Sequence, residues 1–345
     1  MQATTSNDNP SCADPAVKYT PVLLSCRRTA RLYTPMKPST CTEWIANFLA
    51  TDPPRAKSLV MTIFGDTIAP HGGNVWLGSL IELLAPFGVN ERLLRTSVFR
   101  LAQEGWLVAS RERRRSRYAI LPQALARFER ANRRIYAPPE VHWDGSWTLL
   151  LAAGGQVTAS LRKELLWEGY AIVSNGVFGH PAGDPEALKE LLLRLGAESQ
   201  LFVCSATALA QVPGRALPEL VDKGWDLSGV ITLYQQFIER FAPLLEMIEM
   251  IEIMRREAVL APQQAFIIRT LLIHAYRRVQ LHDPMLPAEL LPEPWPGARA
   301  YQLARRLYKA TYAAAQVHVV EVLRREDEQA ALAEAAFFQR FGGLD

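Results

Sequence analysis

The chain has 345 residues, of which 49% are hydrophobic and 21% charged, a composition typical of globular proteins that excludes a disordered or fibrous chain. At roughly 100 to 200 residues per domain, this length predicts two or three domains. No stretch approaches the roughly 20 consecutive apolar residues of a membrane helix, and the first residues lack a secretory signal. We therefore expect a cytoplasmic protein with no membrane partner.

The charge is unevenly distributed, although the net value is only +3. Between Glu91 and Arg134, twelve arginines oppose four glutamates and leave a net charge of +8, so the rest of the chain carries −5. A basic segment in a nearly neutral chain is typical of contact with nucleic acid. The cysteines form no Cys-x-x-Cys pair and are interpreted as free thiols: they are Cys12, Cys26, Cys41 and Cys204.

Residues 1–42 predict a flexible N-terminal arm. They are rich in Thr, Ser and Pro, and their X-Pro steps oppose helix. The arginines of the arm, Arg27, Arg28 and Arg31, are interpreted as part of a solvated tail, with contact to DNA or to a partner as the alternative.

Residues 43–138 predict a winged helix-turn-helix DNA-binding domain. Apolar residues spaced by three and four predict a helix that includes Leu59 and Ile63 and ends before Pro70, and a second helix over 76–84. Asn90 is a favourable N-cap for a third helix that runs to Gln103. Strands at 106–109 and 118–121 then predict a β-hairpin with a six-residue polar tip. Three helices followed by a hairpin is the winged-helix order.

The remaining chain predicts two further domains and an α+β fold. Over 139–224, strands at 147–153, 170–177 and 201–205 alternate with helices at 158–167 and 185–195, which predicts a ferredoxin-like α+β domain if one strand is split. Residues 225–345 predict a C-terminal helical domain for dimer and effector contacts. Its expected helices cover 230–241, 244–256, 263–281 and 301–325.

Two surfaces of the winged helix are candidates for contact with DNA. A helical period turns Leu94, Val98 and Leu101 inward and places these residues on the outer face: Arg92, Arg95, Thr96, Phe99, Arg100 and Gln103. Arginine reads guanine and glutamine reads adenine in the major groove, and we expect no acidic partner for these arginines because Glu91 lies in the first turn. The hairpin tip suits phosphate or narrow minor-groove contacts through Arg111, Arg113, Arg114, Arg115 and Arg117. Solvated surfaces are the alternative for both sets.

Catalytic and cofactor motifs are absent from the sequence. It contains no Gly-x-Ser-x-Gly, no phosphate loop ending in Lys-Ser or Lys-Thr, and no His-Glu-x-x-His. His274, His282 and Asp283 are interpreted as helix-surface and capping residues rather than metal ligands. We therefore expect neither catalysis nor a cofactor or metal.

Several long motifs lie across the chain. The basic domain contains SLVMTIFGD, GGNVWLGSLIELLAPFG, RTSVFRLAQEGWL and RRRSRY, the central region WDGSWTLLL and LLWEGY, and the last part LLIHAYRRVQLHDPMLPAELLPEPWPG and FFQRFGGLD. Over about residues 55–345, these motifs resemble the PaaX family of bacterial repressors of phenylacetic acid degradation.

The resemblance implies a homodimeric repressor that leaves its double-stranded DNA operator when phenylacetyl-coenzyme A binds. It also implies a central domain similar to the ferredoxin-like subunit of CRISPR integration complexes, some of which are nucleases that use an aspartate at the end of the first strand. Residues 151–155, LAAGG, supply no such carboxylate. The alternatives are a DNA-binding regulator or architectural protein without this ligand, and a coenzyme A ester hydrolase or nuclease with a DNA-binding module.

An acyl-coenzyme A requires an apolar slot joined to a basic mouth. Outside the winged helix, residues 269–309 combine seven basic residues with three acidic ones. The candidate effector residues in this region are His274, Tyr276, Arg277, Arg278 and Trp295. A structural role remains the alternative, with Arg277 and Arg278 paired to the acidic helix at 246–257 and Trp295 in the core.

Overall fold

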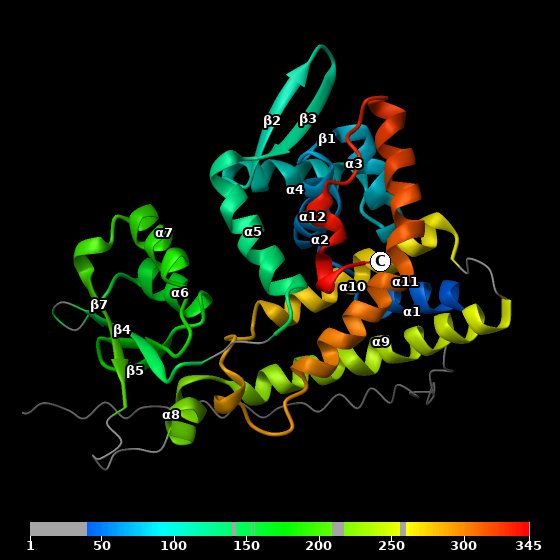
Figure 1. Ribbon diagram of the computed structural model, residues 1–345. Coiled ribbons are helices and arrows are strands. Elements are labelled where there is room, and N and C mark those ends of the chain that lie inside the picture. The colour runs from blue at the N-terminus through cyan, green and yellow to red at the C-terminus, as the bar shows by residue number, and fades with distance from the viewer. Residues whose placement is uncertain are drawn as a thin grey trace, which may run out of the picture. The chain divides into compact units, whose positions relative to one another are not determined.

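The structure, a computed structural model, describes residues 40–344 except 140–142, 153, 155, 209–216 and 256–259. It combines many helices with two small antiparallel sheets, which confirms an α+β fold (Figure 1). The expected arm lies outside the described residues as far as residue 39. Its last two residues belong instead to helix α1, Cys41–Thr51, which was not predicted from the sequence. This helix is amphipathic and buries Trp44 and Phe48.

The next three helices follow the predicted order. Helix α2, Ala56–Ile63, continues into a π-helical turn, Phe64–Ile68, and a 3-10 turn, Ala69–His71. A short strand that was not predicted, β1, Asn74–Trp76, leads into α3, Leu77–Leu84. Helix α4, Glu91–Gln103, begins where Asn90 accepts a hydrogen bond from the backbone N–H of Leu93. The capping prediction is therefore confirmed.

The hairpin after α4 is longer and tighter than predicted. Strands β2, Leu107–Glu112, and β3, Arg115–Ile120, pair along their whole length, so the six-residue tip was wrong and only Arg113 and Arg114 form the turn. These polar residues can pair as strands because their arginine and serine side chains extend into solvent. Their backbone N–H and C=O groups form hydrogen bonds with the opposite strand. The sheet order is β1-β3-β2. Helix α5, Pro122–Tyr136, follows directly and was not predicted either.

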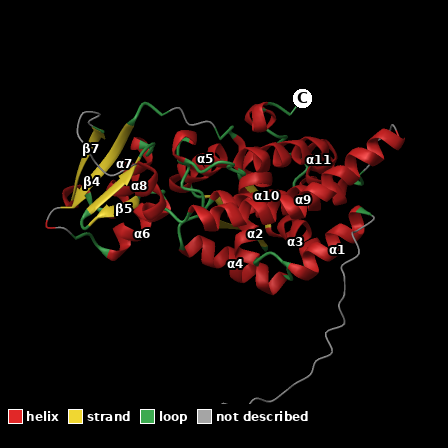
Figure 2. Cartoon of the chain, turned by 90° about the horizontal axis from the view of Figure 1, so that it is seen from below, coloured by secondary structure: helices red, strands yellow, loops and turns green. Residues whose placement is uncertain are grey.

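The central region contains a four-stranded sheet covered by two helices. The order along the chain is β4 Ser146–Ala152, α6 Ala159–Trp167, β5 Ala171–Ser174, β6 Val177–His180, α7 Pro185–Leu195 and β7 Leu201–Thr207. All neighbours in the sheet are antiparallel, in the order β5-β6-β4-β7. The strand predicted at 170–177 is split at Asn175 and Gly176, a pair that favours a tight hairpin turn because glycine adopts positive φ, here 71°. Figure 2 shows this sheet beside the larger helical part.

The last part of the chain is helical. It comprises α8 Leu217–Gly224, α9 Leu227–Arg255, α10 Pro262–Gln280, α11 Gly297–Glu326 and a short α12 Ala335–Phe338. The predicted break between two helices near Pro243 was wrong, because α9 runs through that proline. Proline removes one helical hydrogen bond, and burial of Phe241, Leu244 and Ile248 on either side holds the helix together.

A single hydrophobic core joins the first and last parts of the chain. Leu59 of α2 and Leu94 of α4 belong to the same buried cluster as Phe266 of α10 and Val319 of α11. From the sequence, the C-terminal helices were expected to serve dimer and effector contacts. Much of their apolar surface covers the N-terminal helices of the same chain, and the expectation of dimer and effector contacts stays a prediction.

A buried ionic cluster ties the C-terminal residues to the π-helical turn that follows α2. The Asp66 carboxylate accepts hydrogen bonds from the hydroxyls of Tyr136 (2.7 Å) and Tyr308 (2.9 Å) and from Arg340 Nη1 (3.0 Å). Arg269 Nε lies 3.1 Å from its other oxygen, and both arginines are buried. Burial and the neighbouring Asp66 charge raise the pKa of Tyr136, although Arg340 opposes the shift.

Candidate nucleic-acid interface

The outer face of α4 presents every residue that the helical period placed there. Leu94, Val98 and Leu101 are fully buried, which fixes the rotation of the helix. The opposite face is exposed, including 59% of Phe99, and carries Arg92, Arg95, Thr96, Phe99, Arg100 and Gln103. The structure thus brings these six residues together on one solvent-facing surface.

The expectation that the α4 arginines lack an acidic partner was wrong for Arg95. Its Nε and Nη2 donate to Glu91 Oε1 at 2.8 and 2.5 Å, because residues four apart on a helix face each other. About half of each side chain is exposed, and such pairs contribute about 0 to 1 kcal/mol. A phosphate or a base can therefore displace Glu91 at little cost. In the part of the chain that the structure describes, no carboxylate pairs with Arg92 or Arg100.

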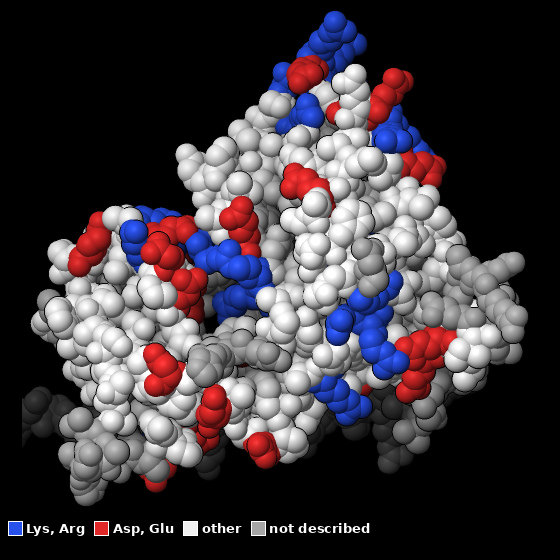
Figure 3. Space-filling view, in the orientation of Figure 1, with Lys and Arg blue, Asp and Glu red and all other residues white. Residues whose placement is uncertain are grey.

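The arginines of the hairpin fall into two groups. Arg111, Arg113 and Arg114 are exposed and make no ion pair with any described residue. Figure 3 shows basic side chains at the top of the molecule, where Figure 1 draws the tip of β2 and β3. Arg113 holds a left-handed φ of 54°, which costs a residue other than glycine about 1 to 2 kcal/mol. The tip therefore presents two adjacent arginine side chains to solvent.

Arg115 and Arg117 instead brace the stem of the hairpin. Their guanidinium groups lie 4.2 and 5.3 Å from the centre of the Trp76 ring. Arg115 also donates to the Glu326 carboxylate (2.5 Å) and carbonyl (2.7 Å) at the end of α11. Arg117 donates to the Asn74 side chain and lies 3.6 Å from Asp327. These two arginines orient the hairpin against α11.

The five candidate effector residues do not form one site. His274 is buried, with Nδ1 3.1 Å from Thr62 Oγ1, and desolvation lowers its pKa to about 4. Tyr276 is buried against Phe237, and burial raises its pKa. Trp295 packs edge-on against Tyr234, with 5.7 Å between ring centres.

The two neighbouring arginines of α10 also diverge. Arg277 Nη1 lies 3.4 Å from Thr62 Oγ1, whereas Arg278 is exposed and lies 3.3 Å from Asp52. Among the described residues, neither pairs with the acidic helix at 246–257. A cleft lies between α5 and α6, and of the five candidates only Arg277 lines it.

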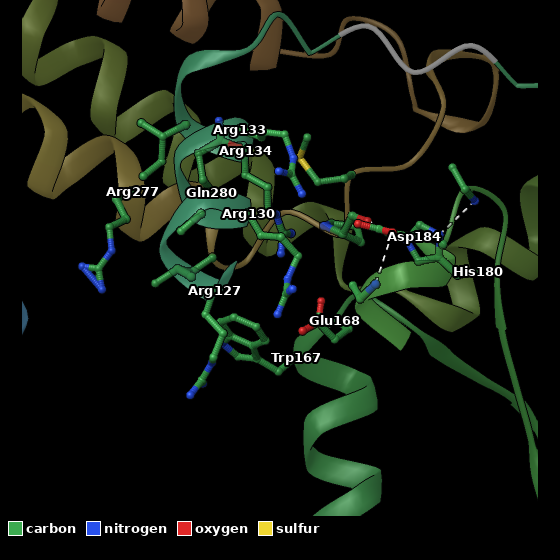
Figure 4. A pocket seen from close by; sticks show the side chains of 18 residues that line it. Arg127, Arg130, Arg133, Arg134, Trp167, Glu168, His180, Asp184, Arg277 and Gln280 are labelled. Carbon is green, nitrogen blue, oxygen red and sulfur yellow. Dashed lines mark hydrogen bonds between the residues drawn. The ribbon is translucent and has the colours of Figure 1, made fainter. Parts of the chain in front are cut away.

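This cleft consists of two adjoining cavities, of about 190 and 770 Å³, and was not predicted from the sequence. The arginines of α5 line one side, and the end of α6 lines the other. Figure 4 shows Arg130 and Glu168 turned toward each other, with Trp167 beside Arg127. The sequence signal for the cleft was the spacing of Arg127, Arg130 and Arg134 by three and four residues, which places the three side chains on one face of a helix.

The described residues contain neither a candidate metal site nor a candidate membrane-spanning helix. No group of three or more His, Cys, Asp or Glu side chains gathers there in a way that would hold a metal ion. None of the helices in the described part is long and apolar enough to span a bilayer.

Comparison with known proteins identifies the family. The PaaX-like protein model matches residues 55–123, and the PaaX-like C-terminal domain model matches residues 225–321. The transcriptional repressor PaaX of Escherichia coli K12 is 36% identical over 297 residues, which cover 85% of this chain and 92% of the relative. The chain belongs to the PaaX family. The resemblance noted from the motifs is confirmed.

The two family models together match helices from both parts of the chain that share the hydrophobic core. The first model spans α2 to the start of α5, including α4 and the hairpin, and the second spans α9, α10 and most of α11. A solved structure, the uncharacterised protein Rv0674 of Mycobacterium tuberculosis, is 25% identical with a TM-score of 0.44, covering 75% of this chain and 98% of that one.

Proposed function

We propose that this protein is a cytoplasmic DNA-binding repressor of phenylacetic acid catabolism genes that leaves its operator when phenylacetyl-coenzyme A binds. The observation that carries DNA binding is the exposed, arginine-rich face of α4 next to a hairpin tipped by Arg113 and Arg114. Family membership and the name of the E. coli relative support repression. That name describes a regulator rather than an enzyme.

The order of elements supports a winged helix-turn-helix in this part of the chain. Helices α2, α3 and α4 are followed by the hairpin, and β1 adds a third strand beside β3. In this arrangement α4 enters the major groove, and the hairpin reaches the adjacent backbone or minor groove. The strand order β7-β4-β6-β5 likewise supports a ferredoxin-like central domain. Together with the C-terminal helices, we propose three functional parts, at 43–138, 139–224 and 225–345, of which the first and the third share one hydrophobic core.

A homodimer is part of the proposal. One recognition helix contacts few base pairs, and two on a symmetric site multiply the specificity. The surface that joins the two copies is separate from the core shared by α2, α4, α10 and α11, because that core is already filled within one chain.

The test is a titration of the purified protein on its operator DNA with and without phenylacetyl-coenzyme A. Binding that the ester reverses, with the ester recovered intact, is the expected result. Binding that the ester does not change would favour a regulator or architectural protein without this ligand. Release accompanied by loss of the thioester would favour an ester hydrolase, and cleavage of the DNA would favour a nuclease.

A further inference from the structure

The cleft between α5 and α6 has a basic wall. Arg127, Arg130, Arg133 and Arg134 of α5 line it together with Arg277 of α10. The smaller cavity has only two acidic lining residues, Glu168 and Asp184. Figure 3 shows basic side chains gathered in a hollow of the surface, between the parts that Figure 1 draws as α5 and as α6 and α7. The lining therefore has a net positive charge.

Four of these five arginines form no ion pair with a described residue, and three of the four, Arg127, Arg134 and Arg277, are partly buried. Arg127 lies over the Trp106 ring at 3.8 Å, Arg134 donates to the Asp283 carbonyl at 2.8 Å, and Arg277 approaches the Thr62 hydroxyl. Within the described residues none of the three forms an ion pair. Arg134 Nε is buried and has no acceptor there. Burial lowers the pKa of each of the three guanidinium groups, so an anion in the cleft would relieve an unfavourable desolvated charge.

The larger cavity supplies an apolar compartment. Met61, Phe128 and Ile273 line it, and Phe128 and Ile273 are almost fully buried. At the rim, Trp167 is 43% exposed and Leu166 is 46% exposed. The volume of about 770 Å³ lies within the usual range of about 300 to 1,000 Å³ for small-molecule sites. Arg127, Trp167 and Arg277 line both cavities.

The cleft also borders the elements of the candidate nucleic-acid interface. Leu101 of α4, Glu104 and Trp106 line its larger cavity. Helix α5 begins two residues after β3 of the hairpin ends. Trp106 packs edge-on against Phe128 of α5, with ring centres 5.7 Å apart. A change in the position of α5 therefore acts directly on the end of α4 and on the hairpin.

We propose that this cleft is the regulatory site, which binds an acyl-coenzyme A with its phosphates on Arg127, Arg134 and Arg277 and its acyl group against Met61, Phe128 and Ile273. The assignment rests on the function proposed above and adds the location of the site and its route to DNA. The bound ligand separates α5 from α6 and thereby shifts α4 and the hairpin out of the DNA-binding arrangement. The ligand favours release from DNA only to the extent that it binds the arrangement with α5 and α6 separated more tightly than the DNA-binding arrangement.

Direct calorimetric titration of the full chain, without DNA, tests the site independently of repression. The ligands are phenylacetyl-coenzyme A, coenzyme A and phenylacetate. Because the ester uses both compartments, we expect it to bind at least about 10-fold more tightly than either fragment. Equal binding of coenzyme A and the ester would overturn the assignment of the apolar compartment.

Variants of two adjacent arginines provide the matched comparison. Arg277→Ala removes a charge from the cleft, whereas Arg278→Ala removes the neighbouring charge, which lies outside it. We expect Arg277→Ala to weaken the ester by about 10-fold or more, the usual effect of losing a hydrogen bond to a charged group. Arg278→Ala should bind the ester like the parent. Trp167→Ala at the exposed rim should also weaken binding, which keeps the test valid if Arg277→Ala does not fold.

The outcomes separate this site from the proposed function. If the parent binds the ester and all three variants match it, the cleft is not the site, although ligand-controlled repression stands. If the parent binds operator DNA but not the ester, the site assignment fails and the repressor keeps only its DNA-binding role. If Arg277→Ala and Trp167→Ala bind DNA normally but need more ester for release, the assignment holds.

Discussion

The hairpin offers the sharpest prediction, because its arginines differ in what they already contact. Arg113 and Arg114 lie at the turn, exposed and without an ion pair among the described residues, whereas Arg115 is held by Glu326 and Trp76. The proposed function requires the first two to contact phosphates. The perturbation is the double substitution Arg113→Ala and Arg114→Ala, and the control is Arg115→Ala.

The expected magnitude follows from counterion release. Each lost phosphate contact lowers the slope of log affinity against log salt concentration by about 0.9, so losing two lowers it by about 1.8. Between about 50 and 200 mM salt, the ratio of parent to variant affinity should then fall by about 12-fold. Arg115→Ala should leave the slope unchanged and lower the free energy of unfolding by about 1 kcal/mol, because an exposed ion pair and a cation–π contact are lost.

Fluorescence anisotropy with labelled operator DNA at several salt concentrations measures the slope, and urea denaturation measures the stability. Random-sequence DNA should show the same loss for the double variant, because phosphates carry no sequence information. An unchanged slope for the double variant would refute the assignment of the tip to DNA. A lower slope for Arg115→Ala would show that this arginine leaves Glu326 and contacts DNA itself.

Three further predictions concern other parts of the molecule. Arg100→Ala should cost about 1 to 3 kcal/mol of binding free energy on the operator and much less on random DNA; equal losses on both would make Arg100 a phosphate contact. Asp66→Asn should lower the free energy of unfolding by about 3 to 5 kcal/mol, because two buried arginines, Arg269 and Arg340, lose their counter-charge; a denaturation midpoint close to the parent value would contradict this. Burial lowers the pKa of His180 and His274 from 6.5 to about 4, so the unfolded chain binds more protons and stability should fall as the pH drops from about 6.5 towards 4; urea titrations at about pH 7 and pH 5 should show a smaller difference for His274→Asn than for the parent.

Local sequence patterns were sufficient for helix α4. The period of Leu94, Val98 and Leu101 fixed the rotation of α4, and with it the exposed residues on the opposite face. The Asn90 cap is likewise a contact between near neighbours. The long motifs are specific enough to indicate the PaaX family from the amino-acid sequence. The Asn-Gly turn and helix α5, neither of which was predicted, also have local signals in the sequence.

Except for Arg95, which pairs with Glu91 four positions away, the misassigned arginines have partners far away in the sequence. Arg115 meets Glu326 across 211 positions, and Arg277 meets Thr62 across 215. The candidate effector set failed to converge because residues close in sequence on α10 point in different directions, so that His274 enters the core, Arg277 the cleft and Arg278 solvent. Proximity in sequence does not place side chains on one face of a helix.

The outer face of α4, its Asn90 cap and the family could be predicted from the amino-acid sequence, because helical periods, caps and motifs are local, whereas α1, β1 and α5 were missed. Only the tertiary structure decided that the N- and C-terminal helices share one core, that two hairpin arginines brace the stem, and that the arginines of α5 face α6 across a cleft. The physical reason is that burial and ion pairing depend on which surfaces meet, and those surfaces belong to segments that the sequence pattern describes one at a time.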